Sequence, residues 1–347
     1  MSFITRISKL FPQAKCKERE PMFLHTTLRV GGPADIFVTV TSTEDLQSLV
    51  RETQNEGLPY VVLGSGSNVL VSDTGVRGVV IHNCSNEIAL VGSGKPEKIC
   101  LSDKPRWDSD SKVGTFRGVE FKDLDYDESE KPRVSLQIDS GVVLPRAIYQ
   151  LFDRGVTGLQ WYGGIPGTIG GAVFNNIHGG THFISEVLSH VEVISRDGSA
   201  KIIKGTDLGF EYDRSIFQQS GDVITRAGFK LFEGDVNRGL STTQEWIKRK
   251  KDQPRNSPGS IFKNISNEDK TRLGYPTTST GFLIEHVLKL TGYKVGGARI
   301  AEQHHNFIVN DGGATAKDCM DIITEVQKRA RETAGIKLEP EIVFLGY

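Results

Sequence analysis

The chain has 347 residues, of which 37% are hydrophobic and 24% are charged, and its formal net charge at pH 7 is −1. This length is typical of two or three domains, and the hydrophobic content is sufficient to form their cores. The balanced charge argues against binding to nucleic acid or to an acidic membrane surface.

The cysteines are scattered and form no Cys-x-x-Cys pair; they are Cys16, Cys84, Cys100 and Cys319. This pattern is typical of a reduced cytoplasmic protein rather than of a disulfide framework or a zinc site. No apolar run reaches the length of a membrane span, and the first residues lack the order of a signal peptide. We therefore expect a cytoplasmic monomer that binds neither membrane nor metal.

The first part of the chain alternates predicted strands with glycine turns. Alternating residues predict a strand over 36–40, and a helix is expected to begin at Ser42 and to end before Gly57. A buried strand over 60–63 follows, and after a short turn another strand is expected over 78–82.

The turn after residue 63 reads Gly64-Ser65-Gly66-Ser67-Asn68 and is itself followed by a strand-like run. Its small residues offer backbone N–H groups in a concave turn that suits phosphate oxygens. It has neither the third glycine of a Rossmann fingerprint nor the lysine of a P-loop. A phosphate-binding turn and a purely structural turn are therefore both open.

The composition changes at about residue 83, and charged residues dominate from about 102 to 133. Such a stretch is typical of a solvated insertion, here with a hairpin near 116–121. A strand over 134–138 resumes the sheet, and a helix over 145–154 follows.

Residues 163–172 contain five glycines in ten positions. Each glycine costs backbone entropy in a helix or strand, and the run is apolar rather than serine-rich, so it is not typical of a linker. This density favours a main chain that passes close to a flat or charged ligand. A tight structural turn is the alternative.

Further strands and helices are predicted in the last part of the chain. They are a hairpin over 191–194 and 200–203, a strand over 224–231, a basic helix over 244–251, a helix over 281–290, a strand over 306–310 and a last helix capped by Thr315 and Asp318.

Six segments of the chain, in this order, resemble the UDP-N-acetylenolpyruvoylglucosamine reductase (UDP-N-acetylmuramate dehydrogenase) family; they are residues 27–34, 63–71, 163–172, 259–264, 304–310 and 338–341. The resemblance implies an α+β fold with two domains. The first is a FAD-binding domain of the vanillyl-alcohol-oxidase-like type over 15–232, with two subdomains split near 83 and the charged insertion at about 102–133. The second is an α+β substrate-binding domain over 237–345, whose last strand returns to the FAD domain.

The resemblance also implies an activity. Proteins of this family reduce UDP-N-acetylglucosamine enolpyruvate to UDP-N-acetylmuramate for peptidoglycan, with non-covalent FAD and with NADPH as co-substrate. The expected partner is thus a UDP-sugar. Charge that builds on the substrate carboxylate during hydride arrival requires a cation or a proton donor, and the neighbouring carbon requires a positioned acid.

Roles for individual residues follow from the resemblance alone. Ser260 would donate the proton, and Glu341 would help to stabilise the enol intermediate. The FAD diphosphate would rest on Gly64, Ser65, Gly66, Ser67 and Asn68, and the flavin end would be covered by Gly163, Ile165, Pro166, Gly167, Thr168, Gly170 and Gly171. The substrate would contact Tyr212, Lys263, Asn264 and His304.

Three departures from the family pattern stand out. The family shows Tyr-Arg-x-Ser-x-Phe, in which the Arg holds the substrate carboxylate, whereas this chain reads Tyr212-Asp213-Arg214-Ser215-Ile216-Phe217. Asp213 occupies the arginine position, and one step along an extended segment reverses the face of a side chain. We expect a backbone shift that aims Arg214 inward, with another cation such as Arg299 as the alternative. The family's Asn-Ala-Gly-Ala-Tyr-Gly reads Asn176-Ile177-His178-Gly179-Gly180-Thr181, and its Pro after Lys-Asn is Ile265.

Two other functions are compatible with part of this pattern. A related FAD-dependent sugar oxidase or dehydrogenase would keep the glycine loops but would not need the motifs at 259–264 and 338–341. A nucleotide-sugar-binding homologue with weakened catalysis would be marked by Asp213.

Overall fold

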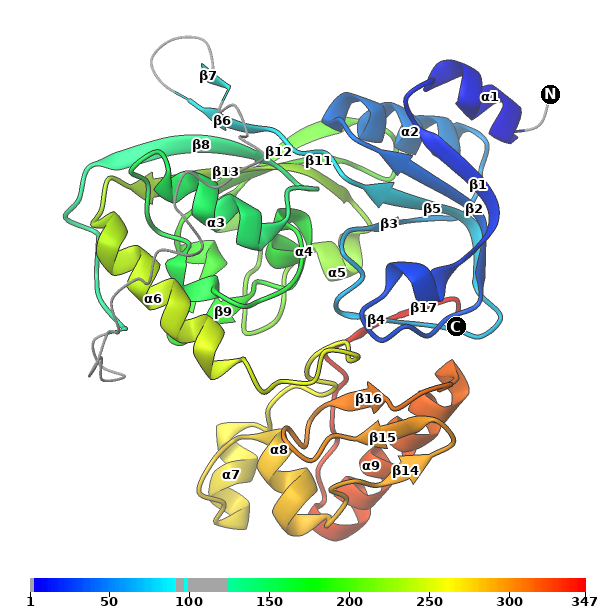
Figure 1. Cartoon of the computed structure of the whole chain (residues 1–347), viewed down its shortest axis with the longest axis vertical. Helices are drawn as coiled ribbons and strands as arrows, with labels where there is room; N and C mark the ends of the chain where they lie inside the picture. Colours follow the sequence, from blue (N-terminus) through cyan, green and yellow to red (C-terminus); the bar gives the residue numbers. More distant parts are fainter. Residues whose placement is uncertain (1–2, 92–96, 99–123) are drawn as a thin grey trace. The chain divides into compact units, whose positions relative to one another are not determined.

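The computed structural model describes residues 3–91, 97–98 and 124–347 (Figure 1). The hairpin expected near 116–121 and most of the charged insertion lie outside these residues. By its internal contacts the chain divides into two compact units, which are described separately. Unit 1 comprises Met1–Lys15, Thr39–Leu58 and Ile81–Lys251, and unit 2 comprises Cys16–Val38, Pro59–Val80 and Asp252–Tyr347. The domain boundaries expected from the sequence stay predictions.

Unit 1 is built on a six-stranded sheet with the order β12-β11-β13-β8-β6-β7. The strands are β6 (Ile88–Leu90), β7 (Glu97–Lys98), β8 (Arg133–Asp139), β11 (Leu188–Ile194), β12 (Ala200–Lys204) and β13 (Val223–Phe232). Neighbouring strands of this sheet pair in antiparallel orientation. Strand β13 is buried along most of its length rather than at alternate residues, because other elements cover both of its faces.

The helices of unit 1 are α1 (Phe3–Leu10), α2 (Thr43–Asn55), α3 (Leu144–Phe152), α4 (Ile169–Phe174), α5 (Phe217–Ser220) and α6 (Val236–Arg249). Of these, α2 and α4 contact β13 of the sheet. Figure 1 shows α3 and α4 on the same side of β8 and β13. The main core of the unit lies there, where Leu144 and Ile148 of α3 and Ile169 of α4 join Ile138 and Phe229 of the sheet.

Short elements connect these parts of unit 1. They are the 3-10 turns η3 (Gln160–Tyr162), η4 (Ile184–Glu186) and η5 (Gly205–Asp207), and the two-stranded ribbon of β9 (His178–Gly179) and β10 (His182–Phe183). The basic helix expected over 244–251 is the end of α6, which begins at Val236. Its early turns contain Gly239, a weak helix former that packing requires, because a Cβ there would lie 2.9 Å from the Phe152 ring.

Unit 2 contains most of a second sheet, in the order β1-β2-β5-β3. Its strands are β1 (Lys15–Pro21), β2 (Pro33–Val40), β3 (Tyr60–Leu63) and β5 (Val76–Asn83), and the 3-10 turn η1 (Met22–His25) follows β1. The unit also has a three-stranded sheet of β14 (Lys294–Val295), β15 (Ala298–Ile300) and β16 (Ile308–Asn310). Strand β17 (Val343–Leu345) pairs in parallel with β4 (Val69–Val71).

The helices of unit 2 are α7 (Asn267–Leu273), α8 (Thr280–Phe282), the π-helix η6 (Leu283–Val287) and α9 (Ala316–Ala334). The expected cap of α9 is confirmed, since Thr315 accepts from the Asp318 N–H. Cys319, Ile322 and Val326 on its buried face pack with Leu283 and Ile300. The helix expected over 281–290 ends at Val287 and widens into a π-turn, in which the Leu288 N–H donates to the Leu283 carbonyl at 2.9 Å. Among the described helices, none has the length and apolar character needed to cross a bilayer.

Candidate functional site

The turn between β3 and β4 in unit 2 has a backbone that admits only glycine at its centre. Gly66 has φ +62°, and a Cβ there would lie 1.9 Å from the carbonyl oxygen of His25. The Gly66 carbonyl accepts from the Thr27 N–H at 3.0 Å, and the Asn68 carbonyl accepts from the Val343 N–H at 2.9 Å. Bonds from two distant segments therefore fix the shape of this turn.

The same turn has donors to offer a ligand. The Gly66 and Asn68 carbonyls accept hydrogen bonds from other segments. The N–H groups of Ser65 and Gly66, in contrast, have no protein acceptor within the part of the chain that the structure describes. Ser65 is exposed. Unpaired N–H groups in a concave turn are the donor set that a phosphate needs, so these residues fit the diphosphate of a FAD molecule.

Three of the expected site segments in unit 2 lie side by side. The Ile261 N–H donates to the Asn306 carbonyl at 2.8 Å, and the Glu341 N–H donates to the Ile261 carbonyl at 2.8 Å. The Asn306 side chain, which is 5% exposed, also bonds the backbone of Phe262 through both its oxygen and its nitrogen. The segment with Ser260 is thus held between residues 304–310 and 338–341.

Glu341 is further linked to the phosphate turn, because the Asn68 side-chain amide donates to the Glu341 carbonyl at 3.3 Å. The structure therefore brings the Ser260 segment, the Glu341 segment and the turn at 64–68 into one unit. These segments come from three parts of the sequence, and hydrogen bonds connect each to the next.

Lys263 and Asn264 lie at the end of this arrangement. The Thr280 hydroxyl donates to the Lys263 carbonyl at 2.6 Å, and the Thr280 N–H donates to the Asn264 side-chain oxygen at 3.3 Å. The Asn264 residue is exposed and the Lys263 residue is half-buried. The Lys263 backbone and the Asn264 side chain are thereby fixed at the start of α8.

His304 carries a polar atom without a protein partner. Its Nδ1 is buried and has no hydrogen-bond partner within the described structure, and its ring lies 4.0 Å from that of Phe307, centroid to centroid. Burial, and next the neighbouring His305, lower the pKa of His304. A buried imidazole nitrogen without a partner is costly unless a ligand or water supplies one.

The glycine-rich stretch of unit 1 lies between η3 and α4, and its glycines have different roles. A Cβ on Gly163 would lie 2.6 Å from the Thr243 carbonyl oxygen, and one on Gly170 would lie 2.9 Å from the Ser140 side chain, so both are needed for packing. A Cβ on Gly171 would meet only the Thr168 hydroxyl, at 3.7 Å. The stretch is thus a tight structural turn in part, with an open face at Gly171 where a ligand can approach the main chain.

The centre of this stretch is accessible. Gly164 has φ +76° and Gly167 has φ +142°, and residues 164–167 are partly or fully exposed. The Thr168 side chain accepts from the Gly171 N–H and caps α4. The exposed main chain and the ring of Pro166 fit the expected cover over a flat flavin.

Lys250 contacts the glycine-rich stretch, and the sequence did not predict this contact. Its ammonium donates to the Gly163 carbonyl at 3.1 Å, and burial lowers its pKa to about 8. The basic run at the end of α6 gave no sign that one of its lysines turns inward. Lys250 follows Trp246 by four residues, a spacing that places two side chains on the same face of a helix, and its Nζ lies 5.6 Å from the Trp246 ring centroid. This spacing is the local signal that Lys250 lies on the same side as an aromatic residue.

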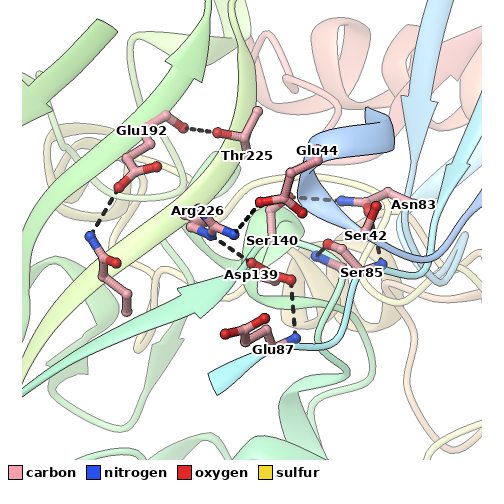
Figure 2. A network of polar contacts seen from close by, with 12 residues as sticks. Ser42, Glu44, Asn83, Ser85, Glu87, Asp139, Ser140, Glu192, Thr225 and Arg226 are labelled. Atoms are coloured by element: carbon pink, nitrogen blue, oxygen red, sulfur yellow. Dashed lines mark hydrogen bonds and ion pairs between the residues drawn. The ribbon is translucent and has the colours of Figure 1, made fainter. Parts of the chain in front are cut away.

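A polar network supports α4 from the sheet side (Figure 2). The Gly170 N–H donates to the Ser140 carbonyl at 2.7 Å, the Ser140 hydroxyl accepts from the Asn83 amide at 2.8 Å, and the Ser140 N–H donates to the Thr225 carbonyl at 3.0 Å. Arg226 bridges the Asp139 and Glu44 carboxylates at 2.9 and 3.0 Å. These contacts fix the start of α4 relative to β8 and β13.

Tyr212 and Asp213 form the two central residues of a tight turn. The backbones of Glu211 and Arg214 exchange two hydrogen bonds of 3.2 Å across it. Asp213 has φ +50° and is 7% exposed, whereas Arg214 is exposed and pairs with the Glu211 carboxylate at 3.3 Å. The structure places the Arg214 guanidinium at the surface, and its assignment to the substrate carboxylate stays a prediction.

Comparison with known proteins gives matches along the whole chain. A family model of the C-terminal domain of UDP-N-acetylenolpyruvoylglucosamine reductase matches residues 251–345, and a FAD binding domain model matches residues 34–91 and 120–203. These matches confirm the expected fold class, an α+β chain with a FAD-binding domain followed by the C-terminal domain of such reductases.

Individual relatives agree with the family models. The UDP-N-acetylenolpyruvoylglucosamine reductase of Heliobacterium modesticaldum is 32% identical over 99% of this chain and 94% of its own length. That of Bacillus subtilis is 31% identical over 96% of this chain and 94% of its own length. The crystal structure of the Thermus caldophilus enzyme has a TM-score of 0.67 and 30% identity, and covers 96% of this chain and 99% of its own.

Proposed function

Because the chain belongs to the UDP-N-acetylenolpyruvoylglucosamine reductase family, we propose that it reduces UDP-N-acetylglucosamine enolpyruvate to UDP-N-acetylmuramate for peptidoglycan synthesis. FAD is the non-covalent cofactor and NADPH the hydride donor. The reaction consumes one NADPH, one proton and the enolpyruvyl double bond, and it yields NADP⁺ and a lactyl ether. We assign it to the cytoplasm, since scattered cysteines suit a reducing compartment, and we propose a monomer as its oligomeric state.

The observation that carries this proposal is the joining of Ser260, Glu341 and the turn at 64–68 within unit 2. When bound, FAD accepts hydride from the nicotinamide and delivers it to the substrate carbon. The residues of the chain must then supply a proton and stabilise negative charge on the substrate. Ser260 and Glu341 suit these two roles, because hydrogen bonds between their backbone segments hold both residues on a rigid support.

The two glycine loops have separate tasks in this proposal. The turn at 64–68 binds the FAD diphosphate through its N–H groups, and the stretch at 163–171 covers the flavin. His304, with its unpartnered Nδ1, and Asn264 with Lys263 hold the nucleotide part of the substrate. The related sugar oxidase is disfavoured, since the C-terminal family model matches the region with Ser260 and Glu341.

Ser260→Ala tests the proposal through the two half-reactions. NADPH should still reduce the bound flavin at a near-normal rate, whereas reoxidation by UDP-N-acetylglucosamine enolpyruvate should slow by at least about 10²-fold, because the proton donor is missing. Stopped-flow absorbance of the flavin measures both rates. Ser266→Ala, which removes the cap of α7 in the same unit, is the matched control and should change neither rate.

Two outcomes would contradict the proposal. Equal slowing of both half-reactions in Ser260→Ala would indicate damage to the flavin site instead of a lost proton donor. A wild-type protein that NADPH reduces but that the enolpyruvyl substrate does not reoxidise would reject the reaction itself and would favour the weakened homologue.

A further inference from the structure

Two departures from the family pattern meet in unit 1. By the resemblance given above, His178 corresponds to the glycine of the family's Asn-Ala-Gly-Ala-Tyr-Gly, and Asp213 corresponds to its arginine. In the structure the His178 Nε2 lies 4.0 Å from the Asp213 Oδ1. A turn in which the resemblance expects a cation therefore lies beside a side chain from another segment that can carry one.

The carboxylate of this pair is held firmly. Asp213 lies in the left-handed region at φ +50°, and its side chain is only 9% exposed. Its turn is tied to the end of α4, because the Ser215 hydroxyl donates to the Phe174 carbonyl at 2.6 Å and the Asn176 amide donates to the Glu211 carbonyl at 2.8 Å. Burying a carboxylate is unfavourable unless hydrogen bonds and a cation compensate for the lost water.

The imidazole is placed by its aromatic neighbours. His178 lies on β9 opposite Phe183 of β10, and its ring centroid is 5.5 Å from that of Phe183 and 5.1 Å from that of Tyr212. Its side chain is 35% exposed, so it contacts the buried carboxylate and also remains accessible. Arg214 in the same turn is already paired with Glu211.

We propose that His178, oriented by Asp213, supplies the positive charge that holds the carboxylate of the enolpyruvyl group in this chain. This inference rests on the proposed function. His178 would donate a hydrogen bond to the substrate carboxylate from one ring nitrogen, while Asp213 stabilises the imidazolium from the other side. Asp213 acts through His178 and is a positioning residue.

A histidine in this role gives the reaction a pH dependence that an arginine would not. An imidazole can lose its charge as the pH rises, whereas a guanidinium keeps it. Reoxidation of the reduced enzyme should therefore slow with rising pH. The described titratable groups on the elements around His178 are Tyr162 of η3, His182 of β10, and Tyr212, Asp213, Glu211 and Arg214 of the turn.

His178→Gln is the direct test. NADPH should reduce its flavin normally, and reoxidation by the enolpyruvyl substrate at acidic pH should slow by about tenfold or more, the strength of a hydrogen bond to a charged group. The wild-type decline with rising pH should be absent from the variant. His190→Gln, another histidine of unit 1 on β11, is the matched control and should keep the wild-type profile.

Asp213→Asn tests the positioning role. Loss of the carboxylate removes the charge that orients the imidazole, so reoxidation should slow while the NADPH half-reaction and the bound flavin stay unchanged. The double variant His178→Gly with Asp213→Arg restores the family residues at both positions. It should recover reoxidation to within about tenfold of wild type and remove the pH dependence, since the cation is then a guanidinium.

Flavin content and the NADPH half-reaction show in each case that the variant is folded. An unchanged rate and pH profile in His178→Gln would overturn the inference, as would a strong loss of reoxidation in Arg214→Ala with His178→Gln silent. If His178→Gln retains no flavin, the double variant His178→Gly with Asp213→Arg provides the test instead. A double variant that is folded but does not recover reoxidation would overturn the proposed role of His178. Failure of wild-type protein to use the enolpyruvyl substrate would instead reject the proposed function.

Discussion

Lys250 illustrates at the residue scale how a charge near the glycine-rich stretch affects the whole unit. Its ammonium is largely buried and donates to the Gly163 carbonyl, a neutral acceptor. Burial penalises the charged form and lowers the pKa of Lys250 from 10.5 to about 8. In the unfolded chain the same amine stays protonated to about pH 10.4. Between these values the unfolded state binds more protons.

The free energy of unfolding should therefore rise with pH as the folded protein passes its Lys250 pKa of about 8. Lys250→Met removes the titrating amine, so its free energy of unfolding should lack this rise. Relative to wild type, the variant should be most stable near about pH 7 and least stable near about pH 10. Urea unfolding at several pH values measures the difference. Lys248→Met, whose side chain is exposed, should show the wild-type slope. Parallel curves for wild type and Lys250→Met would contradict this assignment.

The sequence identified residues within motifs better than it identified their partners. Ser260, Glu341 and Gly66 each stand in a short local pattern, and the structure places their segments in one unit. The approach of His178 to Asp213 depends on how the β9–β10 ribbon meets a turn from another segment. Nothing local encodes that contact. The same holds for Lys250, because its neighbours in α6 are equally basic.

At the scale of elements, the turn at 64–68 shows how strictly a backbone conformation can restrict the sequence. Gly66 and Gly57 have nearly the same φ, +62° and +65°. Their surroundings differ, because a Cβ on Gly57 would have no neighbour within 4 Å, whereas one on Gly66 would strike the His25 carbonyl. A substitution at either glycine would therefore incur backbone strain, but only one at Gly66 would also clash with a neighbouring backbone atom.

Gly57→Ala should accordingly cost only the strain of a left-handed residue, about 1–2 kcal/mol, and should keep its flavin. Gly66→Ala should displace the main chain of the phosphate turn and purify with little or no FAD. The ratio of flavin to protein absorbance measures the loss, and thermal unfolding measures the stability of both variants. Full flavin content in Gly66→Ala would show that the turn does not bind the cofactor.

Predicted elements were most accurate where a local signal sets their ends. The strand expected over 60–63 is β3, and the Ser42 and Thr315 caps begin α2 and α9 as expected. The helix over 281–290 was predicted too long, because periodicity does not reveal the π-turn that ends at Val287. The start of α6 was missed because Gly239, which packs against Phe152, lowers the helical signal.

At the scale of the whole molecule, unit 2 is assembled from three separate stretches of the chain. Strand β17 pairs with β4 through Val343 and Val69, Phe344 and Leu70, and Leu345 and Val71. The Val343 N–H also bonds the Asn68 carbonyl of the phosphate turn. Two compatible apolar runs are visible in the sequence, but their register is not, since pairing at this separation is set by tertiary packing.

Truncation after Ile342 should therefore weaken the phosphate turn as well as the sheet edge. We expect the truncated protein to lose most of its FAD and to unfold at a lower temperature, because β4 loses its parallel partner. Removal of Tyr347 alone, an exposed residue beyond the strand, is the control and should leave the flavin bound. Wild-type flavin content after the longer truncation would show that β17 is dispensable for the turn.

The pairing of β4 with β17 also has a consequence for the order of events during synthesis. The segments of unit 1 end at Lys251, so the ribosome has released all of them before it makes β17. Chains generally begin to fold from the N-terminal side as they emerge. The turn that receives the FAD diphosphate is translated early, yet its bond from Val343 forms only when the last strand has been released. We therefore expect a nascent chain stalled before β17 to hold an incomplete phosphate turn and to bind FAD poorly.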